Sequence, residues 1–278
     1  MLFRSNLPIV KVESGIKRLL GILSPRGGAT AAEAIMTTDT FAKEIAVQFK
    51  AGGKTIRVGG IAKGAGMIQP NMATMLGFLT TDAAIPRAAL QKALTHAVDH
   101  SFNRISVDGD TSTNDTVILL ANGVAGAPPL AKFQEALDFV CLELAKMIVR
   151  DGEGVSKFVT LNVRGAASDR DAVIAARSVA NSVLVKTSWC GGDPNWGRIL
   201  DALGYSRAKV DEDLVDVAYN AVPAVRGGMA TRTPLARLRK IVAQPTFTID
   251  VHLHLGRGHC TMHTCDLTEK YVELNRGE

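Results

Sequence analysis

The strongest constraint on the fold is that short strand-like runs alternate with longer amphipathic segments along most of the chain. Over Pro86–Phe102 apolar residues recur three and four positions apart, which predicts a helix. Thr116–Ala121 is typical of a buried strand, and Leu130–Val149 of a long amphipathic helix. The same order returns with a predicted strand over Phe158–Val163 and a predicted helix over Asp171–Val185. Strands and helices interleaved in this way favour a layered α/β fold.

Further strands are expected on either side of this central stretch. Phe41–Lys50 precedes it, and Phe247–Leu255 alternates like a half-buried strand that ends in a hairpin turn at Gly256–Gly258. Ile56–Val58 and Ile105–Val107 are predicted as short strands. The sequence contains no internal repeat and no clear linker, so a single domain over residues 1–278 is expected.

Composition narrows the class of protein. Hydrophobic residues make up 46% of the 278 residues, enough for a sizeable core. The net charge is +5, but Lys and Arg are scattered rather than clustered, so a nucleic-acid partner is not expected. The sequence shows neither a signal peptide nor a long apolar stretch, and its four cysteines are few. A cytoplasmic protein without a membrane partner is predicted.

One loop-like segment carries a candidate nucleophile. Gly64 and Gly66 lead toward Thr74, which directly follows the small residue Ala73. A threonine hydroxyl is a weak nucleophile until a base takes its proton. If the chain is cut before Thr74, the new α-amino group, which titrates near ~7.7–8.0, can act as that base. Taken alone, however, a threonine in such a loop is ordinary.

The wider context comes from seven signatures spread across the chain. In chain order they are Ala34–Thr40, Lys63–Leu76, Asp108–Thr116, Asp151–Gly154, Leu184–Thr187, Asp193–Arg198 and Asp266–Val272. With these signatures in this order, the sequence closely resembles the ornithine acetyltransferase family, bifunctional glutamate and ornithine N-acetyltransferases of arginine biosynthesis. The resemblance implies a layered α-β-β-α sandwich of the N-terminal-nucleophile type.

The resemblance also implies how the chain is processed. Thr74 matches the family's nucleophile, freed by self-cleavage after Ala73, which would give chains of residues 1–73 and 74–278. The family assembles these pieces as heterotetramers of two α and two β chains.

Four further positions match residues that hold the amino-acid substrate in the family. They are Thr37, Lys63, Glu153 and Asn275. A glutamate can pair with a substrate ammonium group and a lysine with a carboxylate, while the threonine and asparagine supply neutral hydrogen bonds. By composition alone Lys63 and Glu153 are more typical of a solvated cation and a turn residue.

The implied reaction is a two-step transfer. The Thr74 hydroxyl takes the acetyl group from N2-acetylornithine and releases ornithine, and glutamate then takes the acetyl group to give N-acetylglutamate. Some family members also accept acetyl-coenzyme A as donor. No cofactor and no metal are implied, because a hydroxyl, an amine and oxyanion donors suffice for acyl transfer.

Two departures from the family pattern affect these expectations. The family has a longer N-terminal part in which a Ser-Thr-Gly segment forms the oxyanion hole, whereas residues 1–6 stand in that place here. Family chains also continue past the position of Asn275 to a Thr or Ser that contacts substrate. We therefore expect an N-terminally truncated chain. A catalytically impaired remnant and an aminopeptidase-like hydrolase with the same kind of nucleophile remain alternatives.

Two other patterns were weighed as metal sites. The histidines of the segment His252–Cys265 lack standard zinc spacing and are better explained as solvent-facing strand residues. Asp108–Asn114 begins like a calcium loop but has Thr113 and Leu119 where the loop needs Gly and Glu. This segment is instead predicted to be a hydrogen-bonded polar loop near the active centre.

Overall fold

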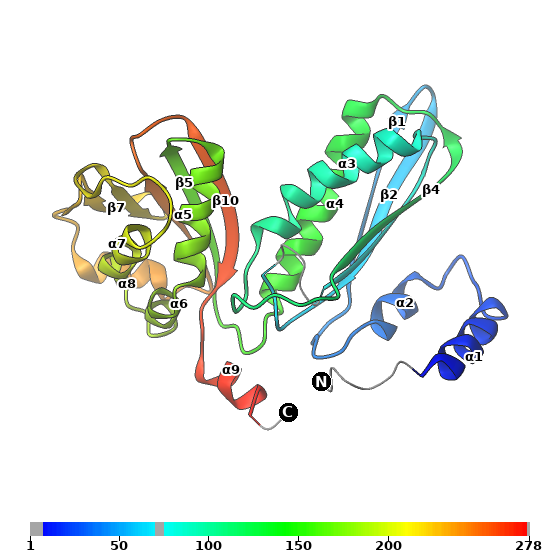
Figure 1. The fold of residues 1–278 in the computed structure, drawn as a ribbon, viewed down its shortest axis with the longest axis horizontal. Coiled ribbons are helices and arrows are strands. Elements are labelled where there is room, and N and C mark those ends of the chain that lie inside the picture. Colours follow the sequence, from blue (N-terminus) through cyan, green and yellow to red (C-terminus); the bar gives the residue numbers. More distant parts are fainter. Residues whose placement is uncertain (1–7, 70–74, 277–278) are drawn as a thin grey trace.

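The structure is a computed structural model that describes residues 8–69 and 75–276. Its strands form two sheets, and each sheet has its own helices and its own hydrophobic core (Figure 1). The two sheets lie side by side, one from the first half of the chain and one from the second. The mixed α/β class predicted from the sequence is confirmed.

The first sheet has the strand order β1-β2-β3-β4. Its strands are β1 (Lys43–Ala51), β2 (Lys54–Lys63), β3 (Leu76–Ala83) and β4 (Thr116–Gly126). The first three are antiparallel neighbours, while β3 and β4 are parallel. A parallel pair needs a crossover connection, which α3 (Arg87–Asp99) and the short helix η1 (Phe102–Arg104) supply.

Helix α4 (Leu130–Arg150) covers one face of this sheet. Its buried residues include Phe133, Leu137, Leu144 and Ile148, which recur at helical spacing on one side of the helix. These side chains join the core of β2 and β3. The helix was predicted to within one residue at its C-terminal end, because its apolar stripe is long and regular.

The opposite face of the first sheet is largely uncovered. The side chains of Leu120 and Val124 in β4 are 62% and 76% exposed. Along β1 and β4 the residues alternate between half-buried and exposed, as expected for a sheet that packs on one side only.

The second sheet has the strand order β10-β5-β9-β6-β7-β8. Its strands are β5 (Phe158–Ala166), β6 (Asp216–Tyr219), β7 (Val222–Arg226), β8 (Met229–Ala230), β9 (Thr246–His252) and β10 (Gly258–Cys265). Its helices are α5 (Asp169–Asn181), α6 (Val183–Cys190), α7 (Trp196–Gly204), η2 (Glu212–Leu214) and α8 (Leu235–Val242). Small residues of α5, such as Ala172, Ala176 and Ala180, bring this helix close to the sheet.

The single helix predicted over Asp171–Val185 is two helices. Ser182 adopts extended backbone angles between them, and its hydroxyl accepts a hydrogen bond from the amide of Val185 as the N-cap of α6. Serine favours such caps over helix interiors because its side chain can replace a backbone partner. The Ala-rich pattern concealed this break.

The strand predicted over Ile105–Val107 was also wrong. Ile105 makes only an isolated bridge to His263 of β10, and the amide of Ser106 donates to the carbonyl of His263 at 3.0 Å. This contact links the segment after η1, in the half of the chain that forms the first sheet, to β10 of the second sheet.

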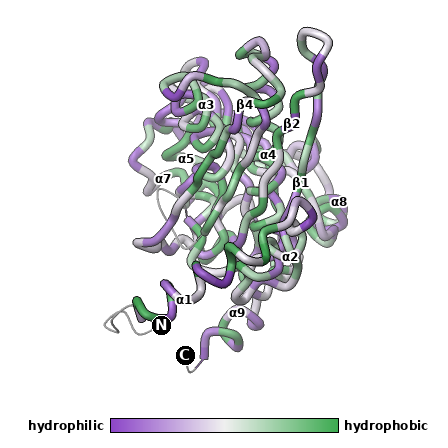
Figure 2. Tube along the Cα trace, turned by 90° about the vertical axis from the view of Figure 1, so that its right-hand side faces the viewer, coloured by the Kyte–Doolittle hydropathy of each residue, from purple (hydrophilic) through white to green (hydrophobic). Residues whose placement is uncertain are grey.

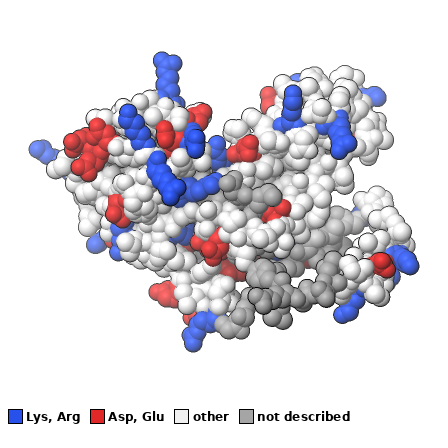
Figure 3. Space-filling view, in the orientation of Figure 1, with Lys and Arg blue, Asp and Glu red and all other residues white. Residues whose placement is uncertain are grey.

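Three further helices lie along the lower side of the molecule in Figure 1. They are α1 (Ile9–Leu20), α2 (Gly28–Ala34) and α9 (Glu269–Leu274). Helix α1 carries apolar and polar residues but buries none of them, and it stands clear of the strands (Figure 2). Within residues 8–69 and 75–276, no helix is both long enough and apolar enough to cross a membrane. Basic and acidic side chains are interspersed over the face shown in Figure 3.

Candidate active site

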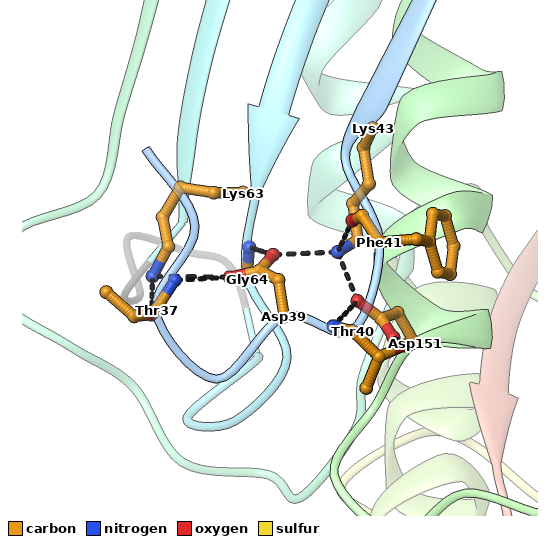
Figure 4. A network of polar contacts seen from close by, with 8 residues as sticks. All are labelled: Thr37, Asp39, Thr40, Phe41, Lys43, Lys63, Gly64 and Asp151. Carbon is orange, nitrogen blue, oxygen red and sulfur yellow. Dashed lines mark hydrogen bonds and ion pairs between the residues drawn. The ribbon is translucent and has the colours of Figure 1, made fainter. Parts of the chain in front are cut away.

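Lys63 and Thr37 meet at the end of β2. Lys63 is the last residue of that strand and pairs in register with Leu76, the first residue of β3. The loop from Gly64 to Met75 therefore begins and ends at the same end of these two neighbouring strands. The Nζ of Lys63, in a side chain only 8% exposed, donates to Thr37 Oγ1 at 2.6 Å (Figure 4). The structure thus brings two of the predicted substrate-binding residues together, offering an ammonium group beside a hydroxyl.

Asp39 lies next to this pair and binds the backbone amides on both sides of it. Its Oδ1 accepts a hydrogen bond from the amide of Gly64 at 2.7 Å, and its Oδ2 accepts one from the amide of Thr37 at 3.1 Å. Burial opposes ionisation of Asp39, but the hydrogen bonds from Gly64, Lys43 and Thr37 outweigh it and hold its pKa below the ordinary value. Asp39 is therefore a carboxylate that fixes the segments carrying Thr37 and Lys63.

Lys43 joins Asp39 to the end of α4. Its Nζ donates to Asp39 Oδ1 at 2.7 Å and to Asp151 Oδ2, and its side chain is fully buried (Figure 4). Asp151 also accepts hydrogen bonds from the amide and the hydroxyl of Thr40. A buried ammonium group is tolerated here because two carboxylates compensate its charge.

Glu153 follows two residues after Asp151, in the turn after α4. Its carboxylate lies against Gly66, where an added Cβ would come within 2.6 Å of the carboxylate carbon and both oxygens. The amide of Glu153 donates to the carbonyl of Ala65 at 3.0 Å. Only glycine at position 66 allows the loop after β2 to pass this close to the acidic side chain.

Asn275 completes the acidic side of the site. Asn275 directly follows α9, and its Nδ2 donates a hydrogen bond of 2.9 Å to Glu153 Oε2. Helix α9 can pack this closely because residue 154 is a glycine. Gly154 has a φ of +70°, and a Cβ there would lie 2.6 Å from the amide nitrogen of Tyr271. Thr268 adds a hydrogen bond of 2.6 Å from its hydroxyl to the carbonyl of Gly154.

The two pairs of predicted substrate-binding residues are linked by a very short segment. Residues 63–66 begin with Lys63 and end at Gly66, against which the Glu153 carboxylate rests. Three peptide steps span at most about 11 Å between Cα atoms. A cation with a hydroxyl and an anion with an amide are therefore carried at the two ends of one short segment, and holding the two opposite charges of an amino acid needs one group of each sign.

The polar loop between η1 and β4 holds the backbone on both sides of residues 70–74. Asp108 accepts hydrogen bonds from the amides of Met67 at 2.6 Å and Ile68 at 2.9 Å. Asp115 accepts one from the amide of Met75 at 2.6 Å. The prediction of a hydrogen-bonded polar loop is confirmed. Ala73 and Thr74, the predicted cleavage site and nucleophile, lie outside the described residues.

A cavity of about 340 Å³ opens beside Met75 and Asp115, with Leu94, Val98 and Phe102 of α3 and η1 among its other walls. Burial raises the pKa of Asp115 to about 6, against the opposing effects of the Met75 amide and the Lys63 charge. This carboxyl group, with its raised pKa, binds the amide of Met75, which is the residue after Thr74 in the sequence.

The sequence reasoning missed Asp39, Lys43 and Asp151 as parts of this site. Asp39 and Asp151 lie inside two of the signatures, so their neighbours Thr37 and Glu153 were a signal that pointed to them. Lys43 lies in no signature and follows the pattern of an ordinary strand residue. Nothing in the local sequence predicts that its ammonium group is buried.

Of the histidines considered as metal ligands, His252 and His254 lie together, with ring centroids 3.8 Å apart, while His259 and His263 have other partners. His254 Nε2 lies 3.0 Å from Asp216 Oδ2, and His259 Nδ1 lies 3.3 Å from Asp169 Oδ1. His263 is buried instead, stacked on Phe158. Within the described part of the chain, no three His, Cys, Asp or Glu side chains are grouped so that they could hold a metal ion.

Comparison with known proteins identifies the family of this chain. The family model described as the ArgJ family matches residues 3–277. The arginine biosynthesis bifunctional protein ArgJ of Symbiobacterium thermophilum is 49% identical over 276 residues, which are 97% of this chain and 69% of that protein. This chain belongs to the ArgJ family. The resemblance inferred from the seven signatures is thereby confirmed.

Other relatives of this ArgJ-family chain extend the comparison. The glutamate N-acetyltransferase of Methanocaldococcus jannaschii is 50% identical over 258 residues, covering 88% of this chain and 64% of that protein. A crystal structure of the arginine biosynthesis bifunctional protein argJ from Bacillus halodurans matches with a TM-score of 0.71 and 41% identity. That match covers 74% of this ArgJ-family chain and all of the chain in the crystal structure.

Proposed function

We propose that this chain is an acetyltransferase of arginine biosynthesis that moves the acetyl group of N2-acetylornithine to glutamate. The observation that carries the proposal is the pairing of Lys63 with Thr37 and of Glu153 with Asn275 at the two ends of the segment 63–66. The names of the relatives, ArgJ and glutamate N-acetyltransferase, support the same activity.

The proposed binding mode assigns one charge of the substrate to each pair. Lys63 and Thr37 take the α-carboxylate, and Glu153 takes an ammonium group, with the Asn275 amide orienting the glutamate side chain. Each contact is a hydrogen bond assisted by charge, which is stronger than a neutral one. This division suits ornithine and N2-acetylornithine, because the δ-ammonium group stays free when the α-amino group carries the acetyl group.

The proposed mechanism uses Thr74 after cleavage of the Ala73–Thr74 bond. The hydroxyl oxygen attacks the acetyl carbonyl while the α-amino group accepts the hydroxyl proton. Ornithine leaves with that proton, and an acetyl-threonine ester remains. The amine of glutamate then attacks the ester, so N-acetylglutamate is released and the threonine hydroxyl is restored. Acetyl-coenzyme A is included as an alternative acetyl donor.

The other expectations of the resemblance belong to the same proposal. They are a single cleaved domain, a heterotetramer of two α and two β chains, and a cytoplasmic location. The four-layer sandwich is also a proposal. It requires a second sheet on the uncovered face of β1–β4, where Leu120 and Val124 are exposed.

Intact-mass measurement and an acetyl-transfer assay test the proposal together. We expect two chains, of residues 1–73 and 74–278, while Thr74→Ala stays whole and inactive. With N2-acetylornithine carrying a labelled acetyl group, the label should appear in N-acetylglutamate only when glutamate is present. Release of free acetate or cleavage of peptides instead would indicate a hydrolase. An uncut chain without transfer would indicate a non-catalytic remnant and defeat the proposal.

A further inference from the structure

Four charged side chains are buried together at the end of β2. They are Asp39, Lys43, Lys63 and Asp151, with side chains between 0% and 8% exposed. Their formal charges cancel. The two lysines are nevertheless not equivalent, because each stands at a different distance from the carboxylates.

Lys43 holds both carboxylates at close range. It contacts Asp39 Oδ1 at 2.7 Å and also Asp151 Oδ2. Lys63 stands 4.0 Å from Asp39 Oδ2, and its close partner at 2.6 Å is the neutral hydroxyl of Thr37. The charge of Asp39 is therefore paired more closely with Lys43 than with Lys63, which forms only a long contact with the same carboxylate.

We propose that Lys43 is a positioning residue that occupies Asp39 and so keeps the Lys63 ammonium group available to a substrate carboxylate. The identity of that carboxylate rests on the proposed function. The arrangement of the charges does not, because it involves only side chains of this chain. Lys43 acts through Asp39 and Lys63 and is itself sealed from the site.

Removal of Lys43 should change the partner of Lys63. Asp151 would keep its hydrogen bonds from the amide and the hydroxyl of Thr40. Asp39 would lose the nearer of the two lysines that contact it among the described residues, and Lys63 is already within 4.0 Å of it. A buried carboxylate without a counter-ion is costly, so Lys63 should move onto Asp39 and away from the substrate position.

Steady-state kinetics provide the first test. We expect Lys43→Met to raise the KM for N2-acetylornithine on the order of tenfold or more, as for loss of one charge-assisted contact, with kcat changed by less than about threefold. The double variant Lys43→Met/Asp39→Asn should recover part of the lost affinity, because the carboxylate that captures Lys63 is gone, but not all of it, because asparagine can accept only one of the two amide hydrogen bonds from Thr37 and Gly64. Lys146→Met, which removes an ion-paired lysine of α4 elsewhere, is the matched control.

A merely structural network predicts a different outcome. Both Lys43→Met and the double variant would then lose thermal stability, and the double variant would be no better in KM than the single one. That result would overturn the inference. The same holds if folded Lys43→Met has an unchanged KM.

Chemical labelling of Lys63 gives a second test that does not depend on enzyme activity. Each protein is treated briefly with acetic anhydride, and acetylation of the peptide containing Lys63 is measured by mass spectrometry. An ammonium group paired closely with a carboxylate gives up its proton less readily, so labelling should slow several-fold in Lys43→Met and recover in the double variant.

The single variant Asp39→Asn covers the case in which Lys43→Met does not fold. It should label Lys63 at least as fast as the wild type does, whereas unchanged labelling in all folded variants would refute the role of Lys43. If the wild type transfers no acetyl group, the proposed function fails while the labelling still decides the role of Lys43.

Discussion

Asn275 and Glu153 are 122 positions apart in the chain, yet the amide Nδ2 of Asn275 donates to the carboxylate Oε2 of Glu153 at 2.9 Å. The contact closes the acidic side of the candidate site with a residue from near the end of the chain. It depends on Gly154, whose positive φ and close contact with the Tyr271 backbone need glycine, and on the space left for the Glu153 carboxylate beside Gly66. The orientation of Glu153 is therefore set from three separate segments.

We expect Asn275→Asp to be more harmful than Asn275→Ala. The aspartate would place a second carboxylate about 3 Å from that of Glu153, and like charges at this distance repel even at an exposed contact that water partly screens. The KM for N2-acetylornithine should rise about 10- to 100-fold in Asn275→Asp, corresponding to about 1.4–2.8 kcal/mol, and by less in Asn275→Ala.

Asn122→Asp, at an exposed position in β4, is the matched control for the added charge. Its kinetics should equal those of the wild type. If Asn275→Ala is the more impaired variant, the amide is needed for a contact other than the one with Glu153.

Gly66→Ala should displace Glu153 without unfolding the protein. The new Cβ would lie 2.6 Å from the carboxylate, and the far end of a glutamate side chain can move away at modest cost. We expect loss of transfer activity of tenfold or more with a small change in melting temperature. Gly204→Ala, where nothing lies within 4 Å of the added atom, should leave both unchanged. Equal activity of the two variants would show that the position of Glu153 is unimportant.

The sequence predicted those parts of the fold that have a long periodic pattern. Helix α4 and strand β5 were expected nearly where they lie, because their apolar residues repeat over many positions. Strands β6 and β8 have four and two residues, too few for a period to show. Ser182 ended a helix whose neighbours on both sides favour helix.

The sequence predicted only those residues of the candidate site that lie in recognisable signatures or match the family. Thr37, Lys63, Glu153 and Asn275 were found through the family resemblance, and the structure places them in two touching pairs. Lys43 was missed, because its importance arises only when the fold brings it against Asp151, 108 positions away. A contact between distant segments leaves no trace in the local pattern of residue types.

His263 should make the protein less stable in mild acid. Burial, together with the charges of Lys146 and Arg150, lowers its pKa to about 4, whereas an unfolded histidine titrates near ~6.5. Between these pH values the unfolded chain binds a proton that the folded chain does not, so the free energy of unfolding falls as pH falls from about 6.5 to 4. The effect is on the order of 2–3 kcal/mol.

The measurement is the melting temperature of the wild type and His263→Gln from pH 7.5 to pH 4.5. The variant should have a shallower dependence on pH, whatever its stability at pH 7.5. His259→Gln, in which an exposed histidine is replaced, should keep the dependence of the wild type. Parallel curves for wild type and His263→Gln would contradict the prediction.

Asp115 should have the opposite effect on stability. Its pKa is raised by burial to about 6, while an unfolded aspartate titrates near ~3.9. The folded chain therefore holds a proton that the unfolded chain has lost between these values. Burial of the charged carboxylate costs stability above pH 6, and the cost disappears as pH falls toward 4.

Asp115→Asn removes that cost and keeps a carbonyl oxygen to accept the hydrogen bond from the Met75 amide. We expect the variant to exceed the wild type in free energy of unfolding by on the order of 1 kcal/mol at pH 7.5, a value reduced because Asp115 is only half-buried. The difference should vanish near pH 4. Urea unfolding at both pH values measures it, with Asp110→Asn from the exposed part of the same loop as control. An equal loss of stability at both pH values would contradict the prediction, because it would mean that position 115 requires an aspartate side chain whether or not that side chain is ionised.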